Sequence, residues 1–385
     1  MEEMKKYILG DVCSRLSSGK GISSDEVFES GPYPVIGGNG LRGYSLRSNF
    51  SGECGVIGRQ GAYCGNVRFF SGEAYMTEHA VVVVGNEKAD TRYLTYLLST
   101  MHLGNLSAQS AQPGLSVKTL AKQEILLPSL PEQKRRASIL ASLEDKIDLN
   151  NRINHNLEEQ AQALYKSWFV DFEPFKGGKF VDSELGLIPE GWHVGTLSEL
   201  GDIVAGGTPS KAKPEYYTNN GIAWLTPKDL SMKCYKFTSR GEIDITENGY
   251  KSSSAKLMPR GSVLFSSRAP IGYISIAKGA ICTNQGFKSV VPRYAGTAYI
   301  YYWLCENTDA IEAQASGSTF KEASGSLMKS FPAIVPDKRV LDSFEEELCP
   351  ILNEQEILEE EISHAEQIRD SLLPRLMSGE LIMNC

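Results

Sequence analysis

The chain has 385 residues, enough for two domains of ordinary size, and its eight cysteines show neither C-x-x-C pairs nor the dense spacing of a disulfide framework or a zinc site. The net charge of −8 at pH 7 argues against a uniformly basic nucleic-acid binder, although the charge is unevenly distributed. No stretch approaches the roughly 18 apolar residues of a membrane span and no apolar run follows the N-terminal lysines, so we expect a cytoplasmic protein.

The first predicted domain spans residues 1–130 and combines short β-rich runs with glycine-containing turns. Residues 80–84 are consecutively apolar and predict a buried strand, whereas residues 37–40 (Gly-Gly-Asn-Gly) predict a tight turn. Arginine can read guanine, and asparagine or glutamine can read adenine, through paired hydrogen bonds, so polar loop residues are candidates for base contacts. In this domain the candidates for DNA binding are Arg59, Gln60 and Tyr63.

Residues 131–172 predict a long helix, because Pro131 is tolerated in a first turn and apolar residues then recur with 3,4 spacing. A helix that runs to about Phe169 is on the order of 55 Å long. Such a seam is typical of a coiled coil, and a buried asparagine within it is expected to pair with an amide of the opposite helix. The seam consists of Leu140, Leu143, Ile147, Asn150, Asn154, Leu157, Ala161, Leu164 and Trp168.

Residues 173–195 contain proline and paired glycines and predict a linker to a second domain, residues 196–336. In this domain residues 262–265 predict a buried strand. From Lys211 to Arg293 there are 13 basic and 5 acidic residues, an excess that could neutralise phosphates. We expect the lysines of its loops to hold phosphates and the other polar residues to face bases. The candidates are Lys211, Lys213, Lys228, Arg268, Asn284, Gln285, Ser318, Thr319 and Lys321.

Residues 337–385 predict a second long helix and a C-terminal tail, with 13 acidic and 4 basic residues. Pro350 should kink or restart this helix. The acidic surface, including Glu359, Glu360 and Glu361, is expected to recruit protein partners. Because the chain returns through a whole domain, the two seams should pack on each other in antiparallel fashion. The second seam consists of Leu341, Phe344, Leu348, Ile351, Gln355, Leu358, Ile362, Ala365, Arg369 and Leu372.

The order of elements in the first half repeats in the second. Residues 9–12 (Leu-Gly-Asp-Val) match residues 200–203 (Leu-Gly-Asp-Ile), and the aromatic run at 93–98 corresponds to a similar run at 299–304. A repeat of this length indicates two similar domains, since solenoid units have roughly 20 to 50 residues. The expected fold class is α+β, with two similar mixed α/β domains separated by two long antiparallel coiled-coil helices and related by a pseudo-twofold internal repeat.

Signatures of catalysis are missing from the sequence. Ser18-Gly19-Lys20 resembles part of a phosphate loop, but Ser14 stands at the position of the first glycine and no serine or threonine follows the lysine. There is no H-E-x-x-H, no G-x-S-x-G and no N/D-P-P-Y/F run of the kind that amino-methyltransferases use. We therefore expect a protein that is not itself an enzyme and that holds no metal.

Several segments resemble the specificity subunits of type I restriction–modification systems, over essentially the whole chain. Residues 126–133 (Leu-Leu-Pro-Ser-Leu-Pro-Glu-Gln) resemble the strand-to-helix junction that ends a target-recognition domain. Residues 165–174 with 186–192 resemble the central conserved region, and residues 315–319 and 369–381 resemble the motifs that close the second half. At the second junction the chain departs from the pattern, with Asp-Lys-Arg at 337–339.

This resemblance implies a target-recognition domain for each half of a split DNA sequence, and helices that set the spacing and dock methyltransferase subunits. It also implies double-stranded DNA, methyltransferase (modification) subunits, two per chain, and a restriction subunit as partners. S-adenosylmethionine, ATP and Mg are expected in those subunits and no cofactor in this chain. The altered second junction would then dock more weakly or differently.

Two hypotheses of different classes follow from the sequence. The first is a DNA-specificity subunit, favoured by the repeat, the paired seams and the basic second domain. The alternative is a coiled-coil scaffold with two protein-binding modules and no DNA contact, which the acidic helices also fit. A third possibility, a self-sufficient methyltransferase, is not supported, because the chain lacks the cofactor and catalytic motifs of such an enzyme. Related domains read unrelated sites through variable loops, so the sequence leaves the recognised bases open.

Overall fold

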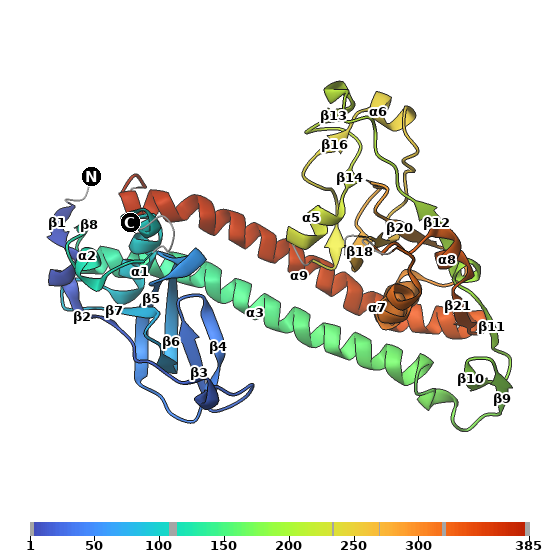
Figure 1. Ribbon diagram of the computed structural model, residues 1–385, viewed down its shortest axis with the longest axis horizontal. Coiled ribbons are helices and arrows are strands. Elements are labelled where there is room, and N and C mark those ends of the chain that lie inside the picture. Colours follow the sequence, from blue (N-terminus) through green and yellow to red (C-terminus); the bar gives the residue numbers. More distant parts are fainter. Residues whose placement is uncertain (1–3, 108–113, 233–234, 269, 318–320, 382–385) are drawn as a thin grey trace. The chain divides into compact units, whose positions relative to one another are not determined.

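The protein is described by a computed structural model over residues 4–107, 114–232, 235–268, 270–317 and 321–381. Its internal contacts divide the chain into two compact units, residues 1–148 with 363–385 and residues 149–362. Both divisions fall inside the long helices α3 (Leu130–Phe169) and α9 (Lys338–Ser378), so each unit contains a part of both helices (Figure 1).

The first unit contains a mixed sheet with the strand order β2-β7-β5-β6-β3-β4 and a separate antiparallel pair, β1-β8. The buried strand predicted at residues 80–84 is β7. The elements of this unit that precede α3 are β1 (Lys5–Ile8), η1 (Leu9–Val12), β2 (Cys13–Ser18), η2 (Ser24–Glu26), β3 (Tyr33–Gly37), β4 (Gly40–Ser45), β5 (Phe50–Gly58), η3 (Gly61–Tyr63), β6 (Val67–Met76), β7 (Ala80–Gly85), α1 (Thr91–Ser99), η4 (Leu103–Leu106), α2 (Val117–Ala121) and β8 (Glu124–Leu127).

The second unit repeats this plan with the sheet β12-β20-β17-β18-β15 and the antiparallel pair β11-β21. The strand predicted at 262–265 is β17. The elements between α3 and α9 are η5 (Glu173–Phe175), β9 (Phe180–Ser183), β10 (Gly186–Pro189), β11 (His193–Thr196), α4 (Leu197–Leu200), β12 (Gly201–Ala205), η6 (Pro214–Tyr216), β13 (Tyr217–Thr218), β14 (Trp224–Leu225), α5 (Pro227–Met232), β15 (Phe237–Thr238), β16 (Asp244–Ile245), α6 (Glu247–Lys251), β17 (Val263–Ser267), β18 (Ile271–Ala277), β19 (Cys282–Thr283), β20 (Lys288–Pro292), α7 (Thr297–Gln314), α8 (Gly325–Ser330) and β21 (Pro332–Val335).

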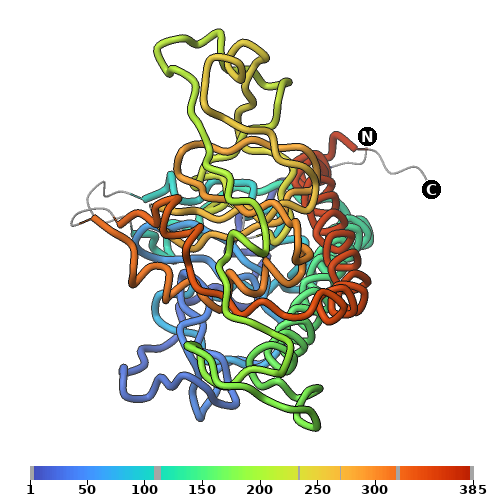
Figure 2. Tube along the Cα trace, turned by 90° about the vertical axis from the view of Figure 1, so that its right-hand side faces the viewer, coloured from blue at the N-terminus to red at the C-terminus, as the bar shows by residue number. Residues whose placement is uncertain are grey.

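The predicted internal repeat is confirmed by the pairing of the strands. The strands β2, β7, β5, β6 and β3 occur in the same order as β12, β20, β17, β18 and β15, and in both sheets the last of these pairs is parallel. The chief difference is the segment that carries β13, β16 and α6, which extends away from the sheet of the second unit (Figures 1 and 2). The segment expected to be a linker contains the β9-β10 hairpin, and β11 already belongs to the second unit.

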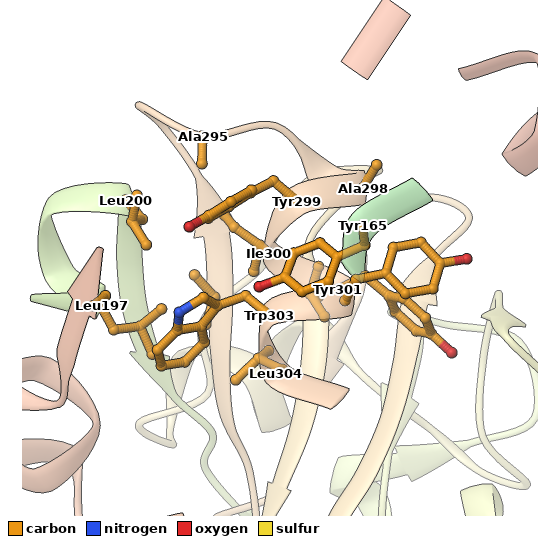
Figure 3. Close-up of a cluster of buried hydrophobic side chains, with 14 of the residues drawn as sticks. Tyr165, Leu197, Leu200, Ala295, Ala298, Tyr299, Ile300, Tyr301, Trp303 and Leu304 are labelled. Atoms are coloured by element: carbon orange, nitrogen blue, oxygen red, sulfur yellow. The ribbon is translucent and has the colours of Figure 1, made fainter. Parts of the chain in front are cut away.

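Aromatic side chains form much of the second unit's core. Tyr165 of α3 packs against Tyr299 of α7, and their ring centroids are 5.8 Å apart (Figure 3). Trp303 and Ile300 of the same helix face the side chains of α4. The aromatic run that repeats at residues 299–304 is therefore a segment of α7 that is buried on all sides, and burial of apolar surface is the main favourable term in folding.

The predicted seams are confirmed, since every seam residue of both helices is buried or half-buried. Within the second unit Asn150 contacts Glu361 and Gln355 contacts Glu158, so α3 and α9 run antiparallel there. In the first unit the Arg136 side chain donates to the carbonyl of Leu376, at 2.8 Å.

One expectation about the helices was wrong, and one of the two alternatives expected at Pro350 is excluded. The Asn150 amide pairs with the carboxylate of Glu361, at 2.9 Å, and not with an amide of the opposite helix. Helix α9 also does not restart at Pro350. This proline is exposed, so water can solvate the carbonyl that it leaves free, while the neighbouring Leu348 and Leu352 are buried in the core and hold the helix together.

The altered second junction has its own hydrogen bonds. In the first unit Gln133 accepts from the backbone N–H of Asp90, at 2.9 Å, just before α1. In the second unit Glu345 of α9 accepts from the N–H of Ala298 in the first turn of α7, at 3.1 Å. Burial raises the pKa of the Glu345 carboxyl, although the backbone amides of this turn oppose the shift. Glu345 lies one turn further along its helix than the position equivalent to Gln133. It supports the start of α7 as Gln133 supports the start of α1 in the first unit.

Candidate nucleic-acid interface

A cavity of about 620 Å³ lies in the second unit. Five of the predicted contact residues line it, namely Lys211, Lys228, Arg268, Asn284 and Gln285. Sequence reasoning missed the rest of its wall, which comprises Thr208, Tyr217, Trp224, Thr226, Pro227, Asp229, Glu242, Ile243 and Gly286. Most of these residues lie in the segment between β12 and β17. The sequence predicts polar turns in this segment, but it does not show that the segment folds back onto the sheet.

The ends of strands bring the cavity residues together. Arg268 directly follows β17, and Asn284 directly follows β19. The two strand ends are tied by a hydrogen bond from the N–H of Ser267 to the carbonyl of Gly286, at 2.7 Å. The loop after β12 approaches so closely that a Cβ on Gly206 would lie 1.9 Å from the Asn284 carbonyl oxygen, so glycine is required there.

Arg268 is a half-exposed cation that pairs with an acidic side chain. Its Nη1 lies 3.3 Å from Oε2 of Glu322, and Nζ of Lys288 lies 3.2 Å from the other oxygen of the same carboxylate. Two cations thus share one acid. Since partly exposed ion pairs contribute little to stability, the guanidinium can leave Glu322 for another acceptor at small cost.

The two amides of the cavity are held by different groups. Asn284 Oδ1 accepts from the N–H of Gly286, at 2.8 Å, and the hydroxyl of Thr208 donates to Oε1 of Gln285. The carboxylate of Asp229 is also engaged, because it accepts from the N–H of Thr226 at 2.7 Å and from that of Glu242 at 2.9 Å.

Two predicted contacts of this domain, Lys213 and Lys321, lie outside the cavity wall. Lys213 does not line the cavity and donates instead to the hydroxyl of Tyr216, at 3.0 Å. Lys321 is exposed and is also outside the cavity wall. Ser318 and Thr319 lie outside the residues that the structure describes.

In the first unit the predicted residues occupy the matching place, after β5. The N–H of Arg59 donates to the carbonyl of His79, and its carbonyl accepts from Leu115, each at 2.9 Å. Gln60 and Tyr63 are exposed. Three loops therefore meet at the end of β5, as they do at the end of β17.

A polar cavity of about 490 Å³ near this loop was missed by sequence reasoning. Its wall includes Asn66, Arg68, His102 and Asn105. Arg68 also donates to Asn39 of the glycine-rich turn, at 3.4 Å. A lone arginine within a β-rich run carries no signal of its own, because the turn that it meets is far away in the sequence.

Lys236, just before β15, joins the second unit's sheet to both long helices. Its ammonium donates to Glu158, to the Tyr302 hydroxyl at 2.7 Å and to Gln355 at 2.8 Å. Its own N–H donates to Glu359 of α9, at 2.8 Å. Burial raises the pKa of the Glu158 carboxyl, but the ammonium and the amides outweigh burial, so this pKa lies below its usual value.

These contacts correct two expectations about charge. Glu359 is buried against backbone amides, Glu360 pairs with Lys278, and Glu361 accepts from Asn150, so the three do not form a free acidic surface. The basic excess of the second domain is also partly neutralised within the unit. Three of its cations pair with acids of the long helices, and they are Lys236, Lys278 and Arg260.

The family of the chain is shown by a model of the type I restriction modification DNA specificity domain, which matches residues 1–159 and again 189–347. The chain belongs to this family. It is 37% identical over 191 residues to the type I restriction enzyme MjaIX specificity subunit of Methanocaldococcus jannaschii, and the match covers 47% of this chain and 44% of that protein. The match therefore spans less than half the length of this relative.

A second relative and a solved structure extend the comparison. The type I restriction enzyme HindI specificity subunit of Haemophilus influenzae is 25% identical over 330 residues, which cover 70% of this chain and 71% of that protein. The crystal structure of the type I restriction-modification system S subunit from M. genitalium has the same fold, with a TM-score of 0.71 at 14% identity, over 100% of this chain and 97% of that one.

None of the helices in the described ranges combines the length and the apolar character that crossing a membrane requires. No cluster of three or more His, Cys, Asp or Glu side chains is placed there to hold a metal ion.

Proposed function

We propose that the chain is the DNA sequence-specificity subunit of a type I restriction–modification complex, in which each domain reads one half of a bipartite DNA site. The observation that carries this proposal is the repeated sheet, which presents Arg59 and Arg268 at the ends of the equivalent strands β5 and β17. Two similar surfaces with arginine and amide side chains suit a target in two parts. No observation favours the alternative, a coiled-coil scaffold with two protein-binding modules, over the DNA-specificity subunit.

In this proposal the chain directs chemistry that other subunits perform. Methyltransferase subunits, two per chain, would bind S-adenosylmethionine and methylate adenine, and a restriction subunit would use ATP and Mg. The test is methylome sequencing of the host with and without the gene. A bipartite motif that disappears with the gene supports the proposal, and an unchanged methylome contradicts it.

Phosphate and base contacts are expected to respond differently to substitution. Lys211 and Lys228 are exposed cations, so Lys211→Ala or Lys228→Ala should weaken binding to every sequence alike and lower the salt slope by about one. Arg268→Ala should cost about 1 to 3 kcal/mol on the cognate site and relax one base of the second half-site only. Binding of the assembled complex to single-base variants at several salt concentrations distinguishes the two. An equal loss on cognate and random DNA would make Arg268 a phosphate contact.

The acidic face of α9 is proposed to dock the methyltransferase through residues that the chain itself does not use. Glu346, Glu347 and Glu354 are exposed and form no ion pair within the described residues. Glu347→Lys with Glu354→Lys should weaken assembly with the methyltransferase and leave the recognised sequence unchanged. Gel filtration of the mixed subunits measures this, and reversal of the exposed Glu73 on β6 is the control. An undisturbed complex would show that these acids are only solvated.

A further inference from the structure

The cavity of the second unit offers hydrogen-bond donors and keeps its acceptors engaged. The oxygen of Asn284 can only be the atom that faces Gly286, because a backbone N–H donates and does not accept. The Nδ2 group remains, and within the described part of the chain no hydrogen bond from it is found. Asn284 therefore presents two N–H donors to a ligand, while its oxygen is turned toward the backbone of Gly286.

The neighbouring groups have the same polarity. Thr208 occupies the oxygen of Gln285, which leaves its NH₂ group as a donor. The side chains of Arg268, Lys211 and Lys228 carry N–H donors and no acceptor. Of the two carboxylates of the wall, Asp229 is engaged, since it accepts from the backbone N–H groups of Thr226 and Glu242. The other, Glu242, is 65% exposed and lies 3.4 Å from Lys228.

Bases differ in how well they match such a surface. In the major groove guanine presents two acceptors, N7 and O6, and no donor. Adenine presents one acceptor beside an amino group, thymine one acceptor beside a methyl group, and cytosine an amino donor. A surface of donors satisfies guanine fully, adenine and thymine by half, and cytosine not at all. The usual paired contact of an asparagine with adenine needs the oxygen that Gly286 already holds.

We propose that the cavity of the second unit, with Arg268 and the Nδ2 group of Asn284 as its readers, selects a guanine in the second half-site. This inference rests on the proposed function and adds the base that the site prefers. A glycine at position 286 is needed for the hydrogen bond between its N–H and the oxygen of Asn284, since a Cβ there would meet Oδ1 of Asn284 at 2.9 Å and a ring carbon of Pro227 at 3.0 Å. The glycine allows the side chain to fold back onto the backbone, and this fixes which end of the amide faces the cavity.

The test is Asn284→Asp in the complete complex with the methyltransferase. The aspartate keeps the oxygen that accepts from Gly286 and replaces the donating NH₂ group by a second acceptor. The matched control is Asn248→Asp, which makes the same change on α6, outside the cavity wall. Both variants add one negative charge, so any general loss of affinity for DNA is compared between them, and selectivity is taken from the ratio of cognate to single-base variant sites.

We expect Asn284→Asp to lower the preference for guanine over other bases at one position of the second half-site by about tenfold or more, with cytosine gaining most. The control and the first half-site should keep their preferences. Loss of selectivity at an A·T pair, or no change of selectivity at any position, would overturn the inference while the proposed function stands. Absence of a bipartite motif in the wild-type methylome would instead contradict the function itself.

Discussion

Replacing Lys236 by methionine is expected to destabilise the second unit by about 3 kcal/mol, because the carboxylate of Glu158 would remain largely buried without its cation. The Lys236 side chain is 7% exposed and that of Glu158 is 23% exposed, which places the effect near the lower end of the range for buried pairs. Its other contacts, to Tyr302 and Gln355, would be lost as well. Denaturant unfolding of the purified chain measures the change.

Two further variants make this prediction specific. The double variant Lys236→Met with Glu158→Gln removes the unpaired charge and should recover a large part of the lost stability. The control Lys228→Met removes a pair whose side chains are 70% and 65% exposed, and it should cost less than about 1 kcal/mol. Equal stabilities of the single and the double variant would show that the pair is not coupled.

Lengthening both long helices is expected to lengthen the DNA spacer without changing either half-site. The two units are joined through α3 and α9, which are hydrogen-bonded side by side at Glu158 and Gln355. An insertion into one helix would shift this register, so one heptad is added to each, after Asn154 and after Glu360, which keeps Glu158 beside Gln355 on one side and Asn150 beside Glu361 on the other. Seven helical residues add about 10.5 Å, which corresponds to about three base pairs at roughly 3.4 Å each.

Methylome sequencing of this variant gives the spacer directly. The preferred gap should grow by about three base pairs, whereas a flexible glycine-serine heptad at the same positions should relax the gap to several lengths. Retention of the original spacer by the rigid variant would contradict the role of the helices as a ruler.

The sequence by itself determined one strand of each sheet, the two long helices and the repetition of the plan. The uninterrupted apolar run at 80–84 identified β7, and the 3,4 spacing from Leu140 onward identified the buried face of α3, because both patterns depend on the local period of the backbone. Matching runs in the two halves likewise revealed two copies of one fold. The family resemblance followed from long motifs of the same kind.

Only the tertiary structure decided which polar groups meet. Lys236 counted as one more cation in a basic segment, yet its partners lie 66 to 123 residues away in the chain and bury it. Glu359 counted as part of an acidic surface, yet it caps the backbone of β15. The amide of Asn284 suited adenine until the position of Gly286 was known. Charge and polarity are local properties of the sequence, but their use depends on the orientation of side chains from distant segments, and packing alone sets that orientation.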